Sequence, residues 1–126
     1  MSIQRGFTLL EMVITVALVA IISSVGYQFY SGYVETADAA VLLQNIDSMR
    51  VFQEDVRVRT GSYGEGTYDF AGGVTTLRTA IGWAPDDRET AIVYVVDTVA
   101  SGAGYTATAT APEGATATKC FGDGCP

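Results

Sequence analysis

The longest uninterrupted pattern in the chain is a stretch of 23 residues without an acidic or basic side chain, from Met12 to Val34. As an α-helix it would rise roughly 34 Å, about the thickness of the hydrocarbon core of a bilayer. The one charge at its head is Glu11, which lies just before the uncharged run. Because a carboxylate is costly to bury in lipid, this position predicts a functional role and a positively charged partner.

A second hydrophobic pattern follows directly, with apolar residues at spacings of three and four. That period is typical of an amphipathic helix that buries one face. The predicted buried positions are Ala39, Leu42, Leu43, Ile46, Met49, Phe52 and Val56, and the predicted polar positions are Asp38, Gln44, Asp47, Gln53 and Glu54. Arg57 and Arg59 suit the negative end of a helix dipole, and Gly61 can cap it. We therefore expect one helix from Phe7 to about Arg59.

The rest of the chain predicts loops and strands. Residues 62–87 are rich in Gly, Thr and Asp, which is typical of loops, apart from a short helical turn around 75–81 that carries Leu77 and Ile81. β-branched and aromatic residues, or small residues alternating with Thr, predict strands at 90–99, 105–111 and 115–121. The expected fold class is α+β, with a long N-terminal helix packed by its second half on a small antiparallel sheet of about three strands.

Composition and charge limit the chemistry that the chain can perform. The formal net charge is −7 and there is no His, so the commonest general base and metal ligand are missing. An acidic surface disfavours nonspecific binding to DNA and to anionic lipid headgroups. We expect no enzyme activity and no cofactor, and calcium binding only if Asp86, Asp87 and Asp123 were to converge. The cations Arg50, Arg57, Arg59, Arg78, Arg88 and Lys119 are expected to be scattered on the surface.

Both cysteines, Cys120 and Cys125, lie close to the C-terminus and flank Phe-Gly-Asp-Gly. This placement suggests a small disulfide loop formed in an oxidising compartment. The alternatives are two free thiols or a Cys-x4-Cys metal clip. Since the chain offers no other Cys or His to complete a metal site, we expect the disulfide.

Residues 5–11 read Arg-Gly-Phe-Thr-Leu-Leu-Glu, which closely resembles the N-terminal signature of type IV pilins and of the pseudopilins of type II secretion. The resemblance implies cleavage between Gly6 and Phe7 by a prepilin peptidase, methylation of the new amine, and retention of the apolar run in the mature protein. A secretory signal peptide would instead be cleaved after its apolar core, for which the small residues at 23–26 could serve. Because Glu11 interrupts the start of that core and the helical pattern continues beyond it, we favour the pilin-type leader.

Cleavage before Phe7 would provide Glu11 with a partner. A buried ammonium and a buried carboxylate are each costly alone, but they offset each other when paired and hydrogen-bonded. The resemblance implies that the glutamate of an incoming subunit meets the amine of its neighbour, which would make Glu11 a residue of subunit assembly. Pairing with Phe7 of the same chain, one helical turn away, is the alternative, and both can occur at different stages.

The sequence departs from the family at one place in the apolar run. Tyr30 and Tyr33 match a tyrosine pair that is usual in pilins, but Gln28 stands where a helix-kinking proline is usual, and no proline precedes Pro85. Gly26 supplies a weaker flexible point, since glycine costs about 1 kcal/mol relative to alanine in a helix interior. The sequence leaves open whether the helix melts here on assembly.

The resemblance implies a structural subunit of a bacterial type IV pilus that polymerises through its N-terminal helix with identical or related subunits. Residues 1–6 are the expected leader, 7–33 the transmembrane and filament-core helix, and 34–126 the globular head. The precursor is expected in the inner membrane, and the mature subunit in an extracellular pilus or a periplasmic pseudopilus. The alternatives are a type II secretion pseudopilin, a minor pilin that mediates adhesion or DNA binding, and a membrane-anchored domain that never polymerises. No small-molecule substrate or nucleic-acid partner is expected.

Overall fold

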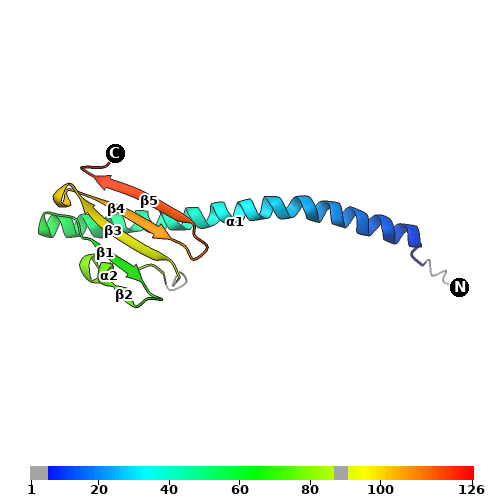
Figure 1. The fold of residues 1–126 in the computed structure, drawn as a ribbon, viewed down its shortest axis with the longest axis horizontal. Coiled ribbons are helices and arrows are strands. Elements are labelled where there is room, and N and C mark those ends of the chain that lie inside the picture. Colours follow the sequence, from blue (N-terminus) through cyan, green and yellow to red (C-terminus); the bar gives the residue numbers. More distant parts are fainter. Residues whose placement is uncertain (1–5, 87–90) are drawn as a thin grey trace. The chain divides into compact units, whose positions relative to one another are not determined.

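The computed structural model describes residues 6–86 and 91–126, and Figure 1 shows the order of the elements along the chain. Contacts divide the chain into two compact units, Met1–Thr36 and Ala37–Pro126, which are described separately below. Apart from Gly6, the expected leader lies outside the described residues. Asp87 and Arg88, named above as a possible calcium ligand and a surface cation, also lie outside them.

Helix α1 (Leu9–Thr60) begins in the first unit, where its side chains are exposed from Leu9 to Val34. Each of four hydroxyl groups on this part donates to a carbonyl oxygen of the preceding turn, namely those of Thr15, Ser23, Ser24 and Ser31. Because these donors are satisfied within the helix, they can enter an apolar environment at little cost. Within the described residues, α1 is the one helix that is long and apolar enough to cross a membrane. The expected single helix is confirmed.

In the second unit, α1 buries a face formed by Leu42, Ile46, Met49, Gln53 and Val56. The prediction that Gln53 lies on the polar face is wrong, because its side chain is wholly buried. Its Nε2 donates to the carbonyl oxygen of Gly64 at 2.8 Å, and the Gly64 N–H donates to its Oε1 at 2.9 Å. Leu43 and Phe52, which were predicted to be buried, are exposed, since both point about 80–100° away from the centre of this face.

A five-stranded antiparallel sheet completes the second unit, with strand order β2-β1-β3-β4-β5 (Figure 1). The strands are β1 (Gly66–Asp69), β2 (Val74–Thr75), β3 (Val93–Val99), β4 (Gly104–Thr110) and β5 (Thr116–Gly122). Strands β3, β4 and β5 confirm the three that were predicted, and the α+β fold class is confirmed. The expectation of about three strands is corrected, because β1 and β2 lie in the segment predicted as loop. They are stabilised by the pairing of β1 with β3, a long-range contact that local composition does not reveal.

Helix α2 (Thr76–Ile81) matches the predicted helical turn and buries Leu77 and Ile81 in the core. The core also contains Tyr94, which is wholly buried, and Trp83, whose ring meets that of Tyr94 edge-on with centroids 5.0 Å apart. Trp83 donates from Nε1 to the hydroxyl of Ser48 on α1 at 2.8 Å. These contacts connect the helices and the sheet through apolar packing and through satisfied polar groups.

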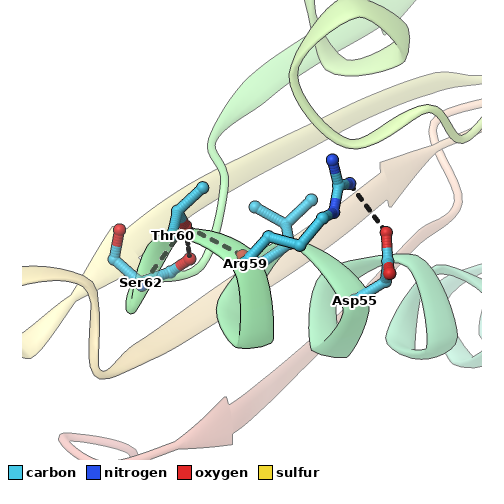
Figure 2. Close-up of polar contacts among 5 residues, drawn as sticks. Asp55, Arg59, Thr60 and Ser62 are labelled. Atoms are coloured by element: carbon cyan, nitrogen blue, oxygen red, sulfur yellow. Dashed lines mark hydrogen bonds and ion pairs between the residues drawn. The ribbon is translucent and has the colours of Figure 1, made fainter.

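Local hydrogen bonds terminate α1 at its C-terminal end (Figure 2). The Thr60 hydroxyl lies 2.9 Å from the carbonyl oxygen of Ser62, and Arg59 forms an exposed ion pair with Asp55 at 2.7 Å. Gly61 adopts a φ of +86° and donates its N–H back into the last helical turn. This geometry confirms the predicted glycine cap.

A disulfide joins Cys120 and Cys125 near the C-terminus, as the placement of the two cysteines predicted. The closed loop lies against the turn between β3 and β4, where the Asp123 N–H donates to the carbonyl oxygen of Ala103 at 3.2 Å. A Cβ atom on Gly122 would come within 2.6 Å of that same oxygen, and its φ is +88°. Glycine is therefore required here for the backbones to approach so closely.

Replacing both cysteines with serine should lower the stability of the second unit by about 2 kcal/mol, because opening a short loop increases the entropy of the unfolded chain. The measurement is limited proteolysis of the full chain in membranes across a urea series, with Thr118→Ser on β5 as the control. We expect cleavage of the second unit at lower urea and unchanged membrane insertion. Equal protease resistance in the double serine variant and the control would contradict the expectation.

Two buried tyrosines provide a matched test of polar burial. The Tyr105 side chain is wholly buried and its hydroxyl has no hydrogen-bond partner among the residues that the structure describes. The Tyr63 hydroxyl donates to Glu54 and accepts from Arg57, each at 2.8 Å. Burial raises the pKa of both phenols above the ordinary 10.0. Each phenol therefore ionises less readily in the folded chain than in the unfolded chain, so ionisation lowers the free energy of unfolding only as the pH rises above about 10.

We expect Tyr105→Phe to leave the free energy of unfolding at neutral pH unchanged or to raise it by up to about 1 kcal/mol, since it removes an unsatisfied hydroxyl. Tyr63→Phe should lower it by about 1 kcal/mol, since two hydrogen bonds are lost. Tyr105→Phe should also reduce the loss of stability at about pH 11. Urea unfolding of the purified full chain in detergent measures both effects, and equal destabilisation by the two substitutions would contradict them.

Candidate functional site

The start of α1 is set by Thr8. Its hydroxyl oxygen accepts the Glu11 N–H at 3.2 Å, and its carbonyl oxygen accepts the Met12 N–H at 3.2 Å. This is the hydrogen bonding of an N-cap residue, and Thr-Leu-Leu-Glu has the sequence form of a capping box. The prediction of a helix start at Phe7 overlooked this local signal, and the helix begins at Leu9 instead.

Glu11 is the acidic residue in the first turn of α1. The N-terminal end of a helix carries partial positive charge, which favours a carboxylate and disfavours a nearby ammonium group. A free amine on Phe7 would lie at this end and would need a negative partner. Within the described part of the chain the Glu11 carboxylate takes part in no ion pair. The arrangement can therefore accept a cation, from the same chain or from another.

Gly6 and Phe7 precede the helix without regular secondary structure, and both are exposed. Among the residues that the structure describes, no atom lies within 4 Å of the place that a Cβ atom on Gly6 would occupy. The fold therefore does not require glycine at this position. An exposed, irregular backbone is also the form of chain that a peptidase can bind and cleave.

The first part of α1 presents an extensive apolar surface. Large apolar side chains are exposed from Phe7 to Val34, with Leu9 84% exposed. Apolar surface in water is unfavourable by about 25 cal/mol per Å². The segment therefore needs lipid or other apolar helices around it, and Glu11 is the one carboxylate at its head.

The other candidate groups do not assemble into a site. Within residues 6–86 and 91–126, no three or more Asp, Glu, Cys or His side chains come together in a way that could hold a metal ion, so Asp86 and Asp123 join no such cluster. Several cations contact groups within the second unit: Lys119 pairs with Asp47 at 2.6 Å, and Arg57 lies over the ring of Tyr63. Arg50 and Lys119 lie 5.9 and 5.8 Å from the centroid of the Phe121 ring. The N-terminal segment remains the best-supported functional site.

Comparison with known proteins bears on this same segment. The family model described as the prokaryotic N-terminal methylation motif matches residues 1–27, which include Gly6, Phe7 and Glu11. No solved structure matches the chain. The match covers the N-cap and the exposed apolar part of α1 as far as Tyr27, and it does not extend to the second unit.

Proposed function

This chain carries the N-terminal signature of type IV pilins and pseudopilins, and from that premise we propose that it is a structural subunit of a bacterial type IV pilus. In this proposal the precursor spans the inner membrane, is cleaved between Gly6 and Phe7, and polymerises through the first part of α1. Residues 34–126 form the head. The observation that carries the proposal is the methylation motif at residues 1–27, at the start of an exposed apolar helix headed by one carboxylate.

The proposed processing creates the charge that Glu11 needs. Hydrolysis of the bond after Gly6 leaves a carboxylate on Gly6 and an amine on Phe7. Methylation of that amine leaves it basic, so it stays positively charged at neutral pH. Glu11 of an incoming subunit can then pair with the amine of the subunit already in the filament.

The pair formed by Glu11 and the Phe7 amine also fixes the axial position of neighbouring helices relative to one another, which apolar packing alone does not. Moving a helix from lipid into a bundle of similar helices exchanges one apolar surrounding for another, so hydrophobic burial contributes little to the choice of position. A carboxylate and an ammonium attract strongly only at one axial offset between neighbours. Glu11 therefore selects the offset at which subunits are added.

The disulfide at the C-terminus supports a pilus in preference to a secretion pseudopilus. A C-terminal disulfide loop is the usual feature of pilins in the family that the sequence resembles, and this chain has one between Cys120 and Cys125. The proposed partners are therefore other copies of this chain, or related subunits, and the peptidase that processes them.

The test is the intact mass and N-terminal sequence of the protein in shear-released surface material and in the membrane pellet. A chain that starts at methylated Phe7 and is abundant in the sheared material is the expected result. The same mature chain confined to membranes would favour the pseudopilin. A chain that starts at Met1, or one cut near Gly26, would contradict the proposal.

Gly6→Ala should impair processing without disturbing the fold. Because the site has room for a methyl group, an effect on cleavage must come from recognition by the peptidase. We expect the precursor to accumulate, with at least about a tenfold fall in the mature fraction, which corresponds to a loss of roughly 1.4 kcal/mol in transition-state binding. Gly26→Ala is the matched control, since Gly26 is also surrounded by open space but lies inside α1. Equal processing of both variants on immunoblots would count against Gly6 as the cleavage residue.

A further inference from the structure

The first part of α1 carries an open hollow along one side. Its volume is about 430 Å³, and all six side chains that line it are apolar. A hollow of this kind accepts an apolar group, because a polar group placed there would lose its hydrogen bonds to water. The lining residues are Leu9, Met12, Val13, Val16, Ala17 and Ala20.

The lining residues have the spacing of a packing surface between helices. Four residues at positions i, i+3, i+4 and i+7 surround a hole that accepts one side chain of a neighbouring helix. The six residues form two such sets in succession, at 9, 12, 13 and 16 and at 13, 16, 17 and 20. Because the side chains of Ala17 and Ala20 are short, a neighbouring helix can approach closely at the second set.

Leu18 lies on the opposite side of the helix, together with Glu11. Successive residues of an α-helix are turned by about 100°, so Leu18 is turned by about 180° from Leu9, which lines the hollow. Glu11 is turned by only about 20° from Leu18. Leu18 is 54% exposed, and Ile14 and Ile22, one turn away from it on the same side, are 50% and 70% exposed. One side of α1 therefore presents protruding apolar side chains, and the other side presents a hollow.

We propose that Leu18 of one copy inserts into the hollow of a neighbouring copy. This inference rests on the proposed function, in which the first parts of α1 pack against one another. Because Leu18 and the hollow are on opposite sides of the helix, each copy can insert its Leu18 into one neighbour and receive the Leu18 of another. Such a heterologous contact continues from copy to copy, as a filament needs.

The axial position of Leu18 favours a second copy as the occupant. Pairing of Glu11 with the Phe7 amine of a neighbour displaces the two helices by about four residues, roughly 6 Å along the axis. Leu18 then lies beside residue 14 of that neighbour, in the middle of the stretch from Leu9 to Ala20 that forms the hollow. The charge complementarity at Glu11 and the fit of Leu18 thus require the same displacement. Lipid chains would fill the hollow at any displacement, so lipid gives no reason for this agreement.

The inserted leucine stabilises the contact by close packing. Lipid tails are as apolar as leucine, so the hydrophobic effect contributes little when the two exchange places. A side chain that fits a hollow gains many dispersion contacts, which are small singly and large together. Leu18 therefore stabilises neighbouring helices only at the displacement where it meets the hollow, which is the displacement that Glu11 selects.

Cysteine cross-linking in filaments tests the proposal directly. The full chain carrying both Val13→Cys and Leu18→Cys should, after oxidation of sheared filaments with copper phenanthroline, give a ladder of covalent multimers on a non-reducing gel. The two positions are about 140° apart around the helix, so they form no disulfide within one chain. Each single-cysteine variant should remain monomeric, because a heterologous contact does not bring two copies of one position together.

Ile14→Cys combined with Leu18→Cys is the matched control. Residue 14 lies beside Leu18 of the neighbour in axial position, but on the side of the helix away from the hollow. Within one chain, Cβ atoms four residues apart on a helix are about 5–6 Å apart, which is too far for a disulfide. The control pair should therefore give no ladder.

The outcomes separate the interface from the proposed function. Filaments of the Val13→Cys and Leu18→Cys variant without a ladder, a ladder equally strong in the control pair, or dimers from either single variant would overturn the interface and leave the pilus subunit standing. If the unmodified chain formed no filaments, the proposed function itself would fail.

An exchange of side-chain size covers the case in which the cysteine variants do not assemble. Ala17→Leu fills the hollow and Leu18→Ala leaves it empty, so each should lower the ratio of filament to membrane subunit by at least about tenfold. A chain with both substitutions should recover part of the yield, because the new leucine takes the space that Leu18 of the neighbour vacates. Ala17→Leu combined with Val19→Ala, which shortens a side chain elsewhere around the helix, should show no recovery. Normal yield from both single variants, no recovery in the exchange, or equal recovery in the control would overturn the proposal.

Discussion

Glu11→Ala should leave the precursor in the membrane and its cleavage intact, but should reduce incorporation into filaments by at least about a hundredfold. Removing one member of a buried charge pair leaves the other uncompensated, at a cost of about 3–5 kcal/mol. In the proposed filament the uncompensated group is the amine of Phe7, which the positive end of α1 disfavours further. The expected defect is therefore in assembly and not in folding.

The measurement compares mature subunit in sheared filaments with mature subunit in membranes, for each variant. Gln28→Ala is the control, because Gln28 is a polar residue in the same exposed part of α1. Glu11→Gln retains the size of the side chain and loses only the charge, so it should behave like Glu11→Ala. A normal filament yield from either Glu11 variant would contradict the proposed pairing.

Gln53→Ala should cause the largest loss of stability among the polar substitutions considered for the second unit, about 3 kcal/mol. The substitution leaves a cavity in the core and removes both hydrogen bonds to Gly64. Gln44→Ala, on an exposed part of the same helix, is the matched control and should change stability by less than about 0.5 kcal/mol.

Gln53→Met separates the two contributions, because methionine fills nearly the same volume without replacing the hydrogen bonds. We expect it to retain part of the stability and to remain about 1–2 kcal/mol below the unmodified chain, since the Gly64 backbone groups lose their partners. Urea unfolding of the purified full chain in detergent measures all three variants. If Gln53→Ala were no worse than Gln44→Ala, the paired amide would not stabilise the second unit.

Local sequence signals predicted the elements whose structure depends on neighbouring residues. Apolar residues at spacings of three and four predicted the second half of α1, and Gly61 predicted its C-terminal cap. Dense β-branched and aromatic residues, or small residues alternating with Thr, predicted β3, β4 and β5 to within a few residues. Thr8 carried an equally local signal, the capping box, which would have placed the helix start correctly.

The sequence predictions were wrong where contacts with residues distant in the sequence decide whether a side chain is buried or a strand forms. Gln53 is polar by type, but the backbone of Gly64 satisfies its amide and allows it to be buried. Strands β1 and β2 have loop-like composition, and they form because β1 pairs with β3. Neither the contact of Gln53 with Gly64 nor the pairing of β1 with β3 can be recognised from the residues that neighbour these segments in the sequence.

The sequence by itself determined the candidate functional site, because the methylation motif, the lone carboxylate Glu11 and the uncharged run are all defined by the order of residues along one segment. Capping, helix dipole and apolar length are all properties of consecutive residues. Only the tertiary structure decided which side chains the second unit buries and which apolar residues it leaves at its surface. Burial depends on contacts between distant segments, so the exposure of Val58 and Phe70 could be known only once the sheet and helices had been placed together.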